Sequence, residues 1–235
     1  MLSDKEKKVH EVFETISAGY DAANTRISLG FQQRWKNYTI DRICRELPQG
    51  GSLVDLCCGT GDMALLAAQK RPDSVITGVD FSDSMLKEAC RRYAELQKEH
   101  AEITWMQGNA TALSFPDETF DSCVISFGLR NTPDYYQVLS EIFRVLKKGG
   151  RIYCLDSFVP ENKAVLPFYR LYFHHIMPII GGGRQYRQQY RWLWQSTEQF
   201  ISKERLLELM EQCKFTADQQ KVFMFGACVM QSAIR

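Results

Sequence analysis

The sequence predicts an α/β fold, a doubly wound, Rossmann-like parallel sheet, and two observations predict it. Apolar runs of strand length alternate with helical patterns from residue 52 to residue 156, as in parallel sheets with helices on both faces. A glycine-rich turn follows the first of these runs, where folds of this class bind ligands. With 235 residues, 45% of them hydrophobic, the chain is expected to form one domain, or one domain with an elaboration.

Strands and helices of the core follow one another along the chain. Five apolar runs have the length of buried strands: 53–56, 75–79, 103–106, 122–126 and 151–155. Three stretches between them have helical spacing: 63–70, 85–97 and 135–146. Thr132-Pro133 is a good start for the last of these helices, because a hydroxyl caps a helix and proline suits its first position. The Lys-Lys-Gly-Gly sequence at 147–150 is a good stop.

Further helices are expected on both sides of this core. Residues 4–18 and 31–47 have amphipathic patterns. The aromatic, apolar stretch 164–183 contains charges, histidines and prolines that argue against a membrane span, so it is either a buried helix or the wall of a lipophilic pocket. Ser202 is expected to cap a last helix, 203–213, and residues 221–234 to supply the final strands.

Composition excludes several classes of protein. A net charge of +1 and a pI near 7.5 give no electrostatic reason to expect nucleic-acid binding. The eight cysteines contain no C-x-x-C and fit neither a zinc site nor a disulfide framework, so we expect no metal and a reducing, cytoplasmic location. The first eleven residues are mostly charged, which is unlike a signal peptide.

The most informative segment runs from Val54 to Asp62, where a strand leads into Asp55 and then into a Gly-Thr-Gly turn. Glycines let the backbone turn sharply and approach a ligand closely. Asp80 ends the second apolar strand, so its carboxylate should lie beside the same turn, because parallel strands end at one edge of the sheet. A carboxylate in that place can accept both hydroxyl groups of a ribose. The arrangement indicates a nucleoside site.

The type of nucleoside follows from the charges beside the turn. A dinucleotide site prefers G-x-G-x-x-G, but Ala64 occupies the third glycine position here. Asp55 and Asp62 flank the turn, and two carboxylates repel a phosphate and favour an ammonium or sulfonium ligand. S-adenosylmethionine (SAM) carries both of these cations, an adenosine and no phosphate. We therefore predict SAM as the cofactor.

Four groups of residues carry a resemblance that runs nearly from end to end. They are Tyr20-Asp21-Ala22-Ala23-Asn24 with Ser28 and Trp35; Gly59-Thr60-Gly61-Asp62; Gly108-Asn109-Ala110 with Phe115-Pro116 and Ser126-Phe127-Gly128-Leu129-Arg130-Asn131; and Arg144-Val145-Leu146-Lys147-Lys148-Gly149-Gly150-Arg151. Together they resemble the ubiquinone/menaquinone biosynthesis C-methyltransferases, a family of class I SAM-dependent methyltransferases. The resemblance implies transfer of a methyl group to a ring carbon of a reduced, polyprenylated benzo- or naphthoquinone precursor.

The resemblance, added to the residue patterns, predicts a site and a division of the chain. The expected cofactor-binding residues are Tyr20, Asp55, Gly59, Thr60, Gly61, Asp62, Asp80, Phe81, Met85, Asn109, Ala110, Ser126 and Phe127. Asp55 or Asp62 should face the ammonium group of SAM, and Asn109 is either an adenine contact or an ordinary turn residue. The single domain divides into an N-terminal helical lid (1–50), a SAM-binding core (51–160), a helical segment on the substrate side (161–200) and a C-terminal helix with the last strands (201–235).

Methylation of an aromatic carbon requires an ionised hydroxyl group on the ring, and therefore a base or a cation that stabilises the phenolate. Arg130 suits the role of the cation, unless it only ties its loop to an acid such as Asp134, and Asn131 can orient an oxygen. The predicted catalytic residues are Arg130, Asn131 and Asp156. The candidates for the base are Asp156, His174, His175, Tyr20 and Asp21, and no pattern in the sequence chooses among them.

Four departures from the family pattern concern the acceptor. Gln32 and Gln231 stand where the family usually has histidine, Leu155-Asp156-Ser157-Phe158 replaces Leu-Glu-Phe-Ser, and Tyr190-Arg191-Trp192-Leu193 replaces Tyr-x-Tyr-Leu. They leave open a methyltransferase that modifies an oxygen or nitrogen of a soluble aromatic molecule, or a SAM-binding protein without transferase activity. A lipophilic quinol acceptor implies contact with the membrane surface, and no nucleic-acid partner is expected.

Overall fold

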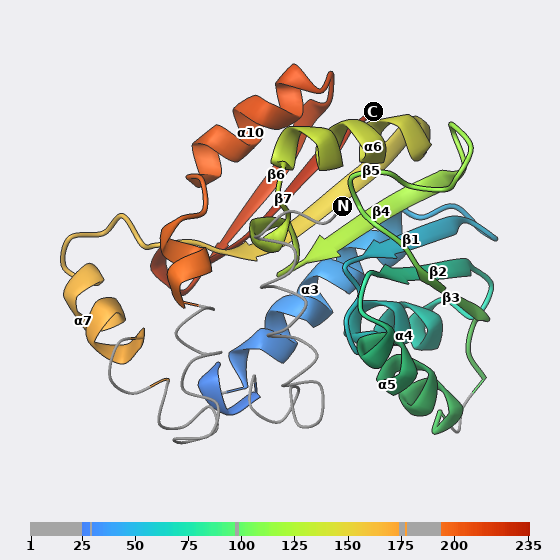
Figure 1. Cartoon of the computed structure of the whole chain (residues 1–235), viewed down its shortest axis with the longest axis horizontal. Helices are drawn as coiled ribbons and strands as arrows, with labels where there is room; N and C mark the ends of the chain where they lie inside the picture. The colour runs from blue at the N-terminus through green and yellow to red at the C-terminus, as the bar shows by residue number, and fades with distance from the viewer. Residues whose placement is uncertain (1–24, 29, 97–98, 174–176, 178–193) are drawn as a thin grey trace.

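The computed structural model describes residues 25–28, 30–96, 99–173, 177 and 194–235. Its centre is a seven-stranded sheet in the order β3-β2-β1-β4-β5-β7-β6. The strands are β1 (Ser52–Leu56), β2 (Val75–Asp80), β3 (Ile103–Gln107), β4 (Phe120–Ser126), β5 (Leu146–Ser157), β6 (Thr216–Phe223) and β7 (Cys228–Ile234). The first five run parallel, and β7 pairs antiparallel with both β5 and β6. The predicted fold class is therefore confirmed (Figure 1).

Helices cover both faces of the sheet (Figure 1). One face carries α3 (Phe31–Glu46), α4 (Asp62–Lys70) and α5 (Asp83–Ala94), and the other carries α6 (Tyr135–Val145) and α10 (Lys203–Gln212). Two clusters of buried apolar side chains form the two halves of the core, one on each face. Both faces are therefore shielded, which explains why the central strands read as continuous apolar runs.

The ends of several elements differ from the expectation. Asp134, and not Thr132, caps α6, accepting a hydrogen bond from the backbone N–H of Gln137. The Thr132 hydroxyl donates instead to the carbonyl of Leu129, within the short 3-10 helix η1 (Leu129–Asn131). Ser202 caps α10 as expected, accepting from the N–H of Arg205.

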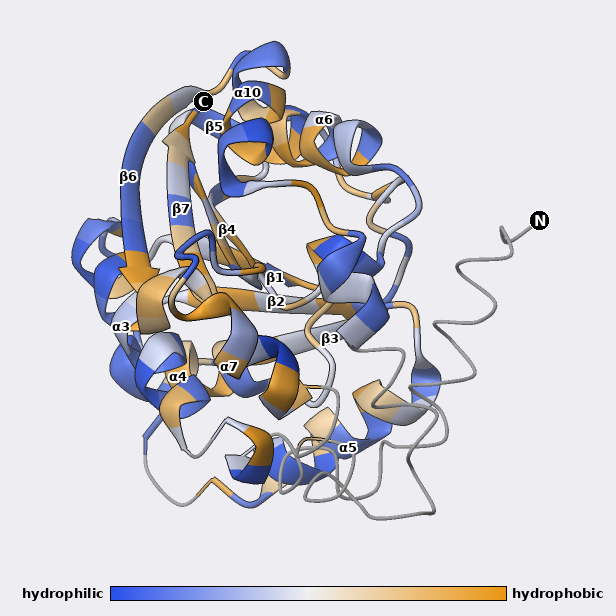
Figure 2. Cartoon of the chain, turned by 90° about the vertical axis from the view of Figure 1, so that its left-hand side faces the viewer, coloured by the Kyte–Doolittle hydropathy of each residue, from blue (hydrophilic) through white to orange (hydrophobic). Residues whose placement is uncertain are grey.

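The edge strand β6 begins at Thr216, five residues before the predicted position 221. Its first residues are mostly polar and exposed, so the sequence shows no strand pattern there. Figure 2 shows β6 as hydrophilic over most of its length. Polar side chains on an edge strand prevent pairing with other chains, so the strand lacks the alternation that predicts strands in a sequence.

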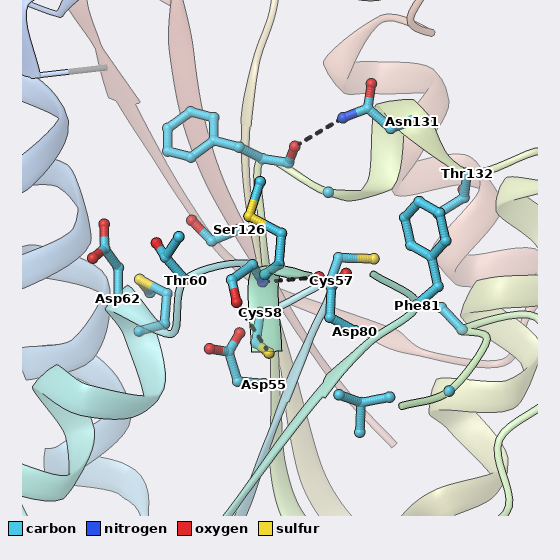
Figure 3. A pocket seen from close by; sticks show the side chains of 18 of the residues that line it. Asp55, Cys57, Cys58, Thr60, Asp62, Asp80, Phe81, Ser126, Asn131 and Thr132 are labelled. Carbon is cyan, nitrogen blue, oxygen red and sulfur yellow. Dashed lines mark hydrogen bonds between the residues drawn. The ribbon is translucent and has the colours of Figure 1, made fainter. Parts of the chain in front are cut away.

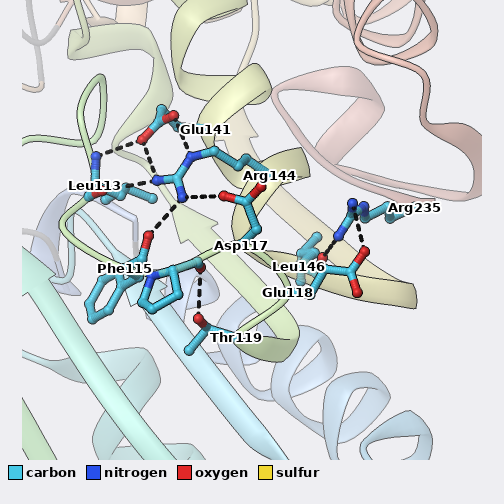
Figure 4. Close-up of polar contacts among 10 residues, drawn as sticks. Leu113, Phe115, Asp117, Glu118, Thr119, Glu141, Arg144, Leu146 and Arg235 are labelled. Carbon is cyan, nitrogen blue, oxygen red and sulfur yellow. Dashed lines mark hydrogen bonds and ion pairs between the residues drawn. The ribbon is translucent and has the colours of Figure 1, made fainter.

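Arg144, from the fourth group of family residues, is a structural tie (Figure 4). Its guanidinium donates to the carbonyls of Phe115 and Leu113, at 2.7 and 2.9 Å, and to the carboxylates of Glu141 and Asp117. These bonds join α6 to the loop between β3 and β4. The last part of the loop therefore has a fixed path into the start of β4, at the amino-terminal ends of β4 and β5.

Beyond β5 the chain forms α7 (Leu166–Leu171). No helix among the described residues is long and apolar enough to cross a membrane. The predicted helix 4–18, the lid residues Tyr20 and Asp21, the histidines His174 and His175 and the departure at 190–193 lie outside the described residues. The division of the chain into four segments stays a prediction.

Candidate active site

The largest group of predicted site residues lies at the carboxyl ends of β1 and β4, which are neighbours in the sheet. From β1 the chain adds β2 and β3 on one side, and from β4 it adds β5 on the other side. In folds of this class, ligands bind at that switch point. A cavity opens there, and Figure 3 shows side chains from both strand ends pointing into it. The predicted residues that line it are Asp55, Gly59, Thr60, Asp62, Asp80, Phe81, Met85, Asn109, Ala110, Ser126, Phe127 and Asn131.

The turns after β1 and β4 are backbone turns of unusual conformation. Cys57 and Phe127, the residues that follow the two strands, have positive φ angles of 54° and 56°. Residues other than glycine rarely adopt this region, and when they do they cluster at functional sites. The Gly59 and Gly61 φ angles are 55° and 85°, which glycine adopts without strain. Three of these residues, Cys57, Gly59 and Phe127, line the same cavity.

Asp80, at the end of β2, lies beside the glycine-rich turn as predicted. Its side chain is buried, and its two oxygens accept hydrogen bonds from the backbone N–H groups of Gly59, at 2.8 Å, and Ser82, at 2.9 Å. Each carboxylate oxygen has a second lone pair that can accept from a hydroxyl group. The geometry suits an acid that holds the loop and a ribose together.

Three buried polar atoms on the cavity wall have no hydrogen-bond partner within the described part of the chain: Asp55 Oδ1, Ser126 Oγ and Asn131 Oδ1. Buried polar atoms are normally paired, so an unpaired group on a cavity wall points to a ligand. Asp55 Oδ2 accepts from the N–H of Ala64 at 3.1 Å, in the first turn of α4. The three atoms can accept from an ammonium group and from hydroxyl or amine donors, which fits the donors of SAM.

The pKa of Asp55 is raised from its ordinary 3.8 to about 8. Burial is the main cause, and the neighbouring carboxylates of Asp80 and Asp62 add to it, while the hydrogen bond from Ala64 and the charge of Lys36 act in the opposite direction. A buried acid with a raised pKa, in a cavity, is typical of a functional site. A bound cation next to Asp55 offsets both effects, because it favours the ionised form.

Asp62 differs from Asp55 because it is already paired with two cations. Its carboxylate lies 2.5 Å from Lys36 Nζ and 2.7 Å from Arg92. Burial raises its pKa, but the charges of Lys36 and Arg92 outweigh that effect and hold the pKa below its usual value. Of the two acids that flank the turn, Asp55 is therefore the one with an oxygen left for an ammonium group.

Residues from β2, α5 and the loop after β3 form the other end of the cavity. Phe81 and Met85 line it, and the Asn109 side chain accepts from the N–H and the hydroxyl of Thr111, at 3.0 and 2.9 Å. Asn109 was expected to be either an adenine contact or an ordinary turn residue, and these hydrogen bonds make it a turn residue. It also lies on the cavity wall, together with Ala110. An apolar wall with a polar edge suits a purine base.

Gly61 does not line the cavity. It packs on the side of the turn that faces away from the cavity. The indole of Trp105, on β3, fills the space behind it: a Cβ at Gly61 would lie 2.6 Å from the ring, and one at Gly78 would lie 2.5 Å from it. The turn therefore packs against an aromatic surface on the side away from the cavity.

A second cavity of about 390 Å³ adjoins the first, and Gln32 and Phe127 line both. Its aromatic lining residues are Phe31, Trp35, Phe127, Tyr169, Tyr172, Phe173 and Phe225. Arg130 is the one charged side chain among the described residues that line it. The stretch 164–183, for which a buried helix was the alternative, thus supplies part of a pocket wall through α7 and the residues after it.

Arg130 and Asp156 form a buried ion pair, with side chains 7% and 0% exposed. Arg130 also donates to the Phe127 carbonyl at 2.9 Å, and its guanidinium lies 5.7 Å from the centre of the Phe127 ring. The ion pair holds the guanidinium on the wall of the apolar cavity, next to Phe127, which lines both cavities. The alternative to a catalytic role for Arg130 was an ion pair that ties its loop to an acid such as Asp134. Arg130 does form such a pair, but with Asp156 and not with Asp134.

The residues that depart from the family pattern fall into two groups. Gln32 and Ser157 line the apolar cavity. Phe158 is buried against Phe200, with ring centres 5.1 Å apart, and Gln231 donates to the Lys203 carbonyl at 2.7 Å. Neither Phe158 nor Gln231 lines either cavity.

Lys36, Cys57, Cys58 and Thr132 also line the cofactor cavity, although sequence reasoning did not assign them. A vicinal cysteine pair beside the turn was a visible signal for the two thiols. Lys36 gave none, because it is one basic residue among several on an amphipathic helix.

Comparisons with known proteins agree with this geometry. Residues 1–235 match the ubiE/COQ5 methyltransferase family. A demethylmenaquinone methyltransferase of Listeria monocytogenes serotype 4a is 38% identical over 219 residues, which are 92% of this chain and 90% of the relative. One from Halalkalibacterium halodurans is 37% identical over 238 residues, covering 100% of this chain and 95% of the relative.

Solved structures share the fold. A SAM-dependent methyltransferase from Methanosarcina mazei has a TM-score of 0.60 at 24% identity, covering 82% of this chain and 94% of its own. One from Aquifex aeolicus has a TM-score of 0.59 at 15% identity, covering 83% and 88%. The chain therefore belongs to the ubiE/COQ5 methyltransferase family and is an enzyme that uses S-adenosylmethionine as its methyl donor.

Proposed function

We propose that this enzyme methylates a ring carbon of a reduced isoprenoid quinone precursor, an acceptor like demethylmenaquinol. The observation that carries the proposal is the pair of adjoining cavities. One carries three polar atoms that have no partner among the described residues and fits SAM. The other is aromatic, with one guanidinium on its wall beside Phe127, which lines both cavities. An acceptor with an apolar tail and a hydroxylated ring matches the second cavity, and demethylmenaquinone is the acceptor in the names of the relatives.

The chemistry assigns separate tasks to the residues of the two cavities. Bound SAM supplies an electrophilic methyl group on a sulfonium, so the carbon–sulfur bond breaks as the ring carbon forms its new bond, and the ring then loses a proton. Arg130 stabilises the negative charge of an ionised ring hydroxyl, which pushes electron density onto the carbon that reacts. Asn131, whose Oδ1 has no partner within the described residues, orients a hydroxyl or amine donor. The apolar walls exclude water and hold the two partners in line.

Asp156 has a different role in this proposal from that of a base. Its carboxylate is fully buried, is paired with Arg130, accepts from the Ser157 N–H at 2.8 Å and lines neither cavity. An acid held in this way positions the guanidinium. The remaining candidates for the base, Tyr20, Asp21, His174 and His175, lie outside the described residues.

The second candidate function is methylation of an oxygen or nitrogen of a soluble aromatic molecule. Gln32 and Ser157 favour it, because both departures from the family pattern line the acceptor cavity. Polar amide and hydroxyl groups there can recognise an acceptor with different substituents on the ring.

One experiment distinguishes the two functions. Methyl transfer from labelled SAM is measured with a short-tailed demethylnaphthoquinol and, in parallel, with its oxidised quinone. Product from the reduced form alone, with the label on a ring carbon, is the expected result, because the oxidised ring has no hydroxyl to ionise. No product from either, with SAM binding intact, contradicts the quinol proposal and turns attention to soluble acceptors.

We also propose that the enzyme acts in the cytoplasm, in contact with the membrane surface. Phe168 on α7 and Phe225 in the turn between β6 and β7 are 74% and 73% exposed, and Leu171 is 55% exposed. Phe225 lines the apolar cavity, and so does Tyr169, the neighbour of Phe168 on α7, so these exposed side chains belong to segments that form the cavity wall. Large exposed apolar patches mark interaction surfaces.

Flotation with vesicles tests this contact. The wild-type enzyme is expected to float with phosphatidylglycerol-containing vesicles, and Phe168→Ser/Phe225→Ser is expected to float less while keeping its affinity for SAM. The exposed Val75, 60% exposed at the opposite end of the strands from the cavities, supplies the control variant Val75→Ser. Equal flotation of all three proteins contradicts the proposed surface.

A further inference from the structure

Lys36 is the one basic side chain among the described residues that line the cofactor cavity. It comes from α3, which lies outside the predicted SAM-binding core in the sequence. Lysine is rarely buried unless it is paired, and Lys36 is only 8% exposed. A buried cation on the wall of a cavity that binds a charged molecule requires an explanation.

The carboxylate of Asp62 does not balance all of the positive charge around it. Lys36 Nζ lies 2.5 Å from Asp62 Oδ2, and Arg92 lies 2.7 Å from Asp62 Oδ1, so one carboxylate faces two cations. Arg92 also donates to the carbonyl and hydroxyl of Thr60, at 2.9 and 3.0 Å. Asp62 therefore keeps a partner if Lys36 turns to a ligand. An ammonium group has three N–H donors, and Asp62 takes one.

The methionine end of SAM carries two opposite charges, an ammonium group and a carboxylate. The cavity wall offers one partner for each: the Oδ1 of Asp55, which has no partner in the described part of the chain, for the ammonium, and the ammonium of Lys36 for the carboxylate. A buried carboxylate without a cation costs several kcal/mol, on the order of the buried-charge penalties in proteins. The other basic residue of the cluster, Arg92, does not line the cavity.

We propose that Lys36 binds the carboxylate of the methionine moiety of SAM, and that this contact fixes α3 over the cofactor. The same helix carries Phe31, Gln32 and Trp35, which line the apolar cavity. Binding of the cofactor thus sets the position of one wall of the acceptor cavity. Lys36 is a cofactor-binding residue and also a positioning residue for the acceptor.

Decarboxylated SAM tests the contact directly, because it lacks the carboxylate and keeps the ammonium, the sulfonium and the adenosine. Calorimetry with the wild-type enzyme is expected to give about tenfold to hundredfold weaker binding of decarboxylated SAM than of SAM, the range for a hydrogen bond to a charged group. Lys36→Met is expected to lose that preference and to bind both molecules as weakly as the wild type binds decarboxylated SAM. Lys36→Arg is expected to recover much of the preference.

The control is Lys70→Met. Lys70 on α4 pairs with Asp41 on α3, so this variant also breaks an ion pair between the two helices, but Lys70 does not line the cavity. It is expected to keep the wild-type preference for SAM. Thermal unfolding without ligand checks that each variant is folded, and Lys36→Met/Asp62→Asn removes the pair as a whole if Lys36→Met alone is unstable.

Two results overturn the proposal. A wild-type enzyme that binds the two molecules equally has no recognition of the carboxylate. If Lys36→Met weakens the binding of both by the same factor, Lys36 acts through Asp62 on the loop and does not touch the carboxylate.

Discussion

The unusual acid–base behaviour of Asp55 gives a quantitative prediction about stability. Burial raises its pKa from an ordinary 3.8 to about 8 in the folded enzyme without ligand. The folded state therefore binds one more proton than the unfolded state over this interval. The stabilisation from the protonated form is complete below the unfolded pKa, and it is lost as the pH rises through the folded pKa.

The magnitude follows from the linkage relation. One extra bound proton lowers the free energy of unfolding by about 1.4 kcal/mol for each pH unit. Asp55→Asn removes this titration and leaves an oxygen that can accept from the Ala64 N–H, as Asp55 Oδ2 does at 3.1 Å. Between roughly pH 6 and 7.5, the variant should therefore gain about 2 kcal/mol of stability relative to the wild type.

Urea unfolding of both proteins without SAM, at the two pH values, measures the difference. Other titrating groups are common to the two proteins, so they cancel when the curves are subtracted. Asp83→Asn, which removes an exposed carboxylate from the first turn of α5, controls for the loss of one negative charge. Parallel pH profiles of the wild type and Asp55→Asn would refute the reasoning, because Asp55 would then titrate in the usual range.

The same residue should respond to the cofactor in the opposite direction. Pairing with the ammonium of SAM requires the ionised acid, so binding at neutral pH should release close to one proton. Calorimetry in two buffers with different ionisation enthalpies measures that proton. Asp55→Asn should bind SAM more weakly and release none, so the substitution that stabilises the fold at high pH harms the site.

Three further predictions concern the site. Asp80→Ala should weaken SAM binding by about tenfold or more without unfolding the enzyme, because the ribose hydroxyls lose a charged acceptor, and an unchanged affinity in calorimetry would exclude that role. Arg130→Ala should lower turnover by about a hundredfold, with a smaller effect on SAM affinity. The double variant Arg130→Ala/Asp156→Asn should regain stability but not turnover. Equal losses of turnover and of SAM affinity would place Arg130 in the cofactor site. Gly128→Ala should destabilise the fold by about 1–3 kcal/mol, because its Cβ would lie 2.4 Å from that of Cys57. Adding Cys57→Gly should raise the melting temperature again, because glycine adopts the φ of 54° at position 57 without strain. No recovery in the double variant would mean that the clash is relieved elsewhere.

Much of the fold followed from the sequence because buried parallel strands leave strong signals. The five apolar runs became β1 to β5, and the acid after β2 lies beside the glycine-rich turn. This placement was predictable because parallel strands all end at one edge, so residues far apart in the sequence share a position by topology alone.

Partnerships between side chains could not be predicted in the same way. Lys36 and Asp62, and Arg130 and Asp156, are each 26 residues apart, and each pair depends on how a helix or loop packs against the sheet. The helix α6 begins at Tyr135 as predicted, but the predicted capping residue was wrong for a local reason. Two candidate caps, Thr132 and Asp134, lie two residues apart, and the 3-10 helix before α6 uses the hydroxyl of the first.

Trp105 changes how the glycines near the cofactor are understood. Its indole occupies the space behind Gly61 and Gly78, so both positions exclude a side chain whether or not a ligand is present. An engineered enzyme with a smaller residue at 105 should accept alanine at 78, where the ring is the main obstacle and the next atom, Cys58 Sγ, would lie 3.3 Å from the added Cβ. Position 61 should stay restricted, because its φ of 85° disfavours any side chain even after the ring is gone. The residues that positions 61 and 78 tolerate are therefore determined in part by Trp105, which lines neither cavity.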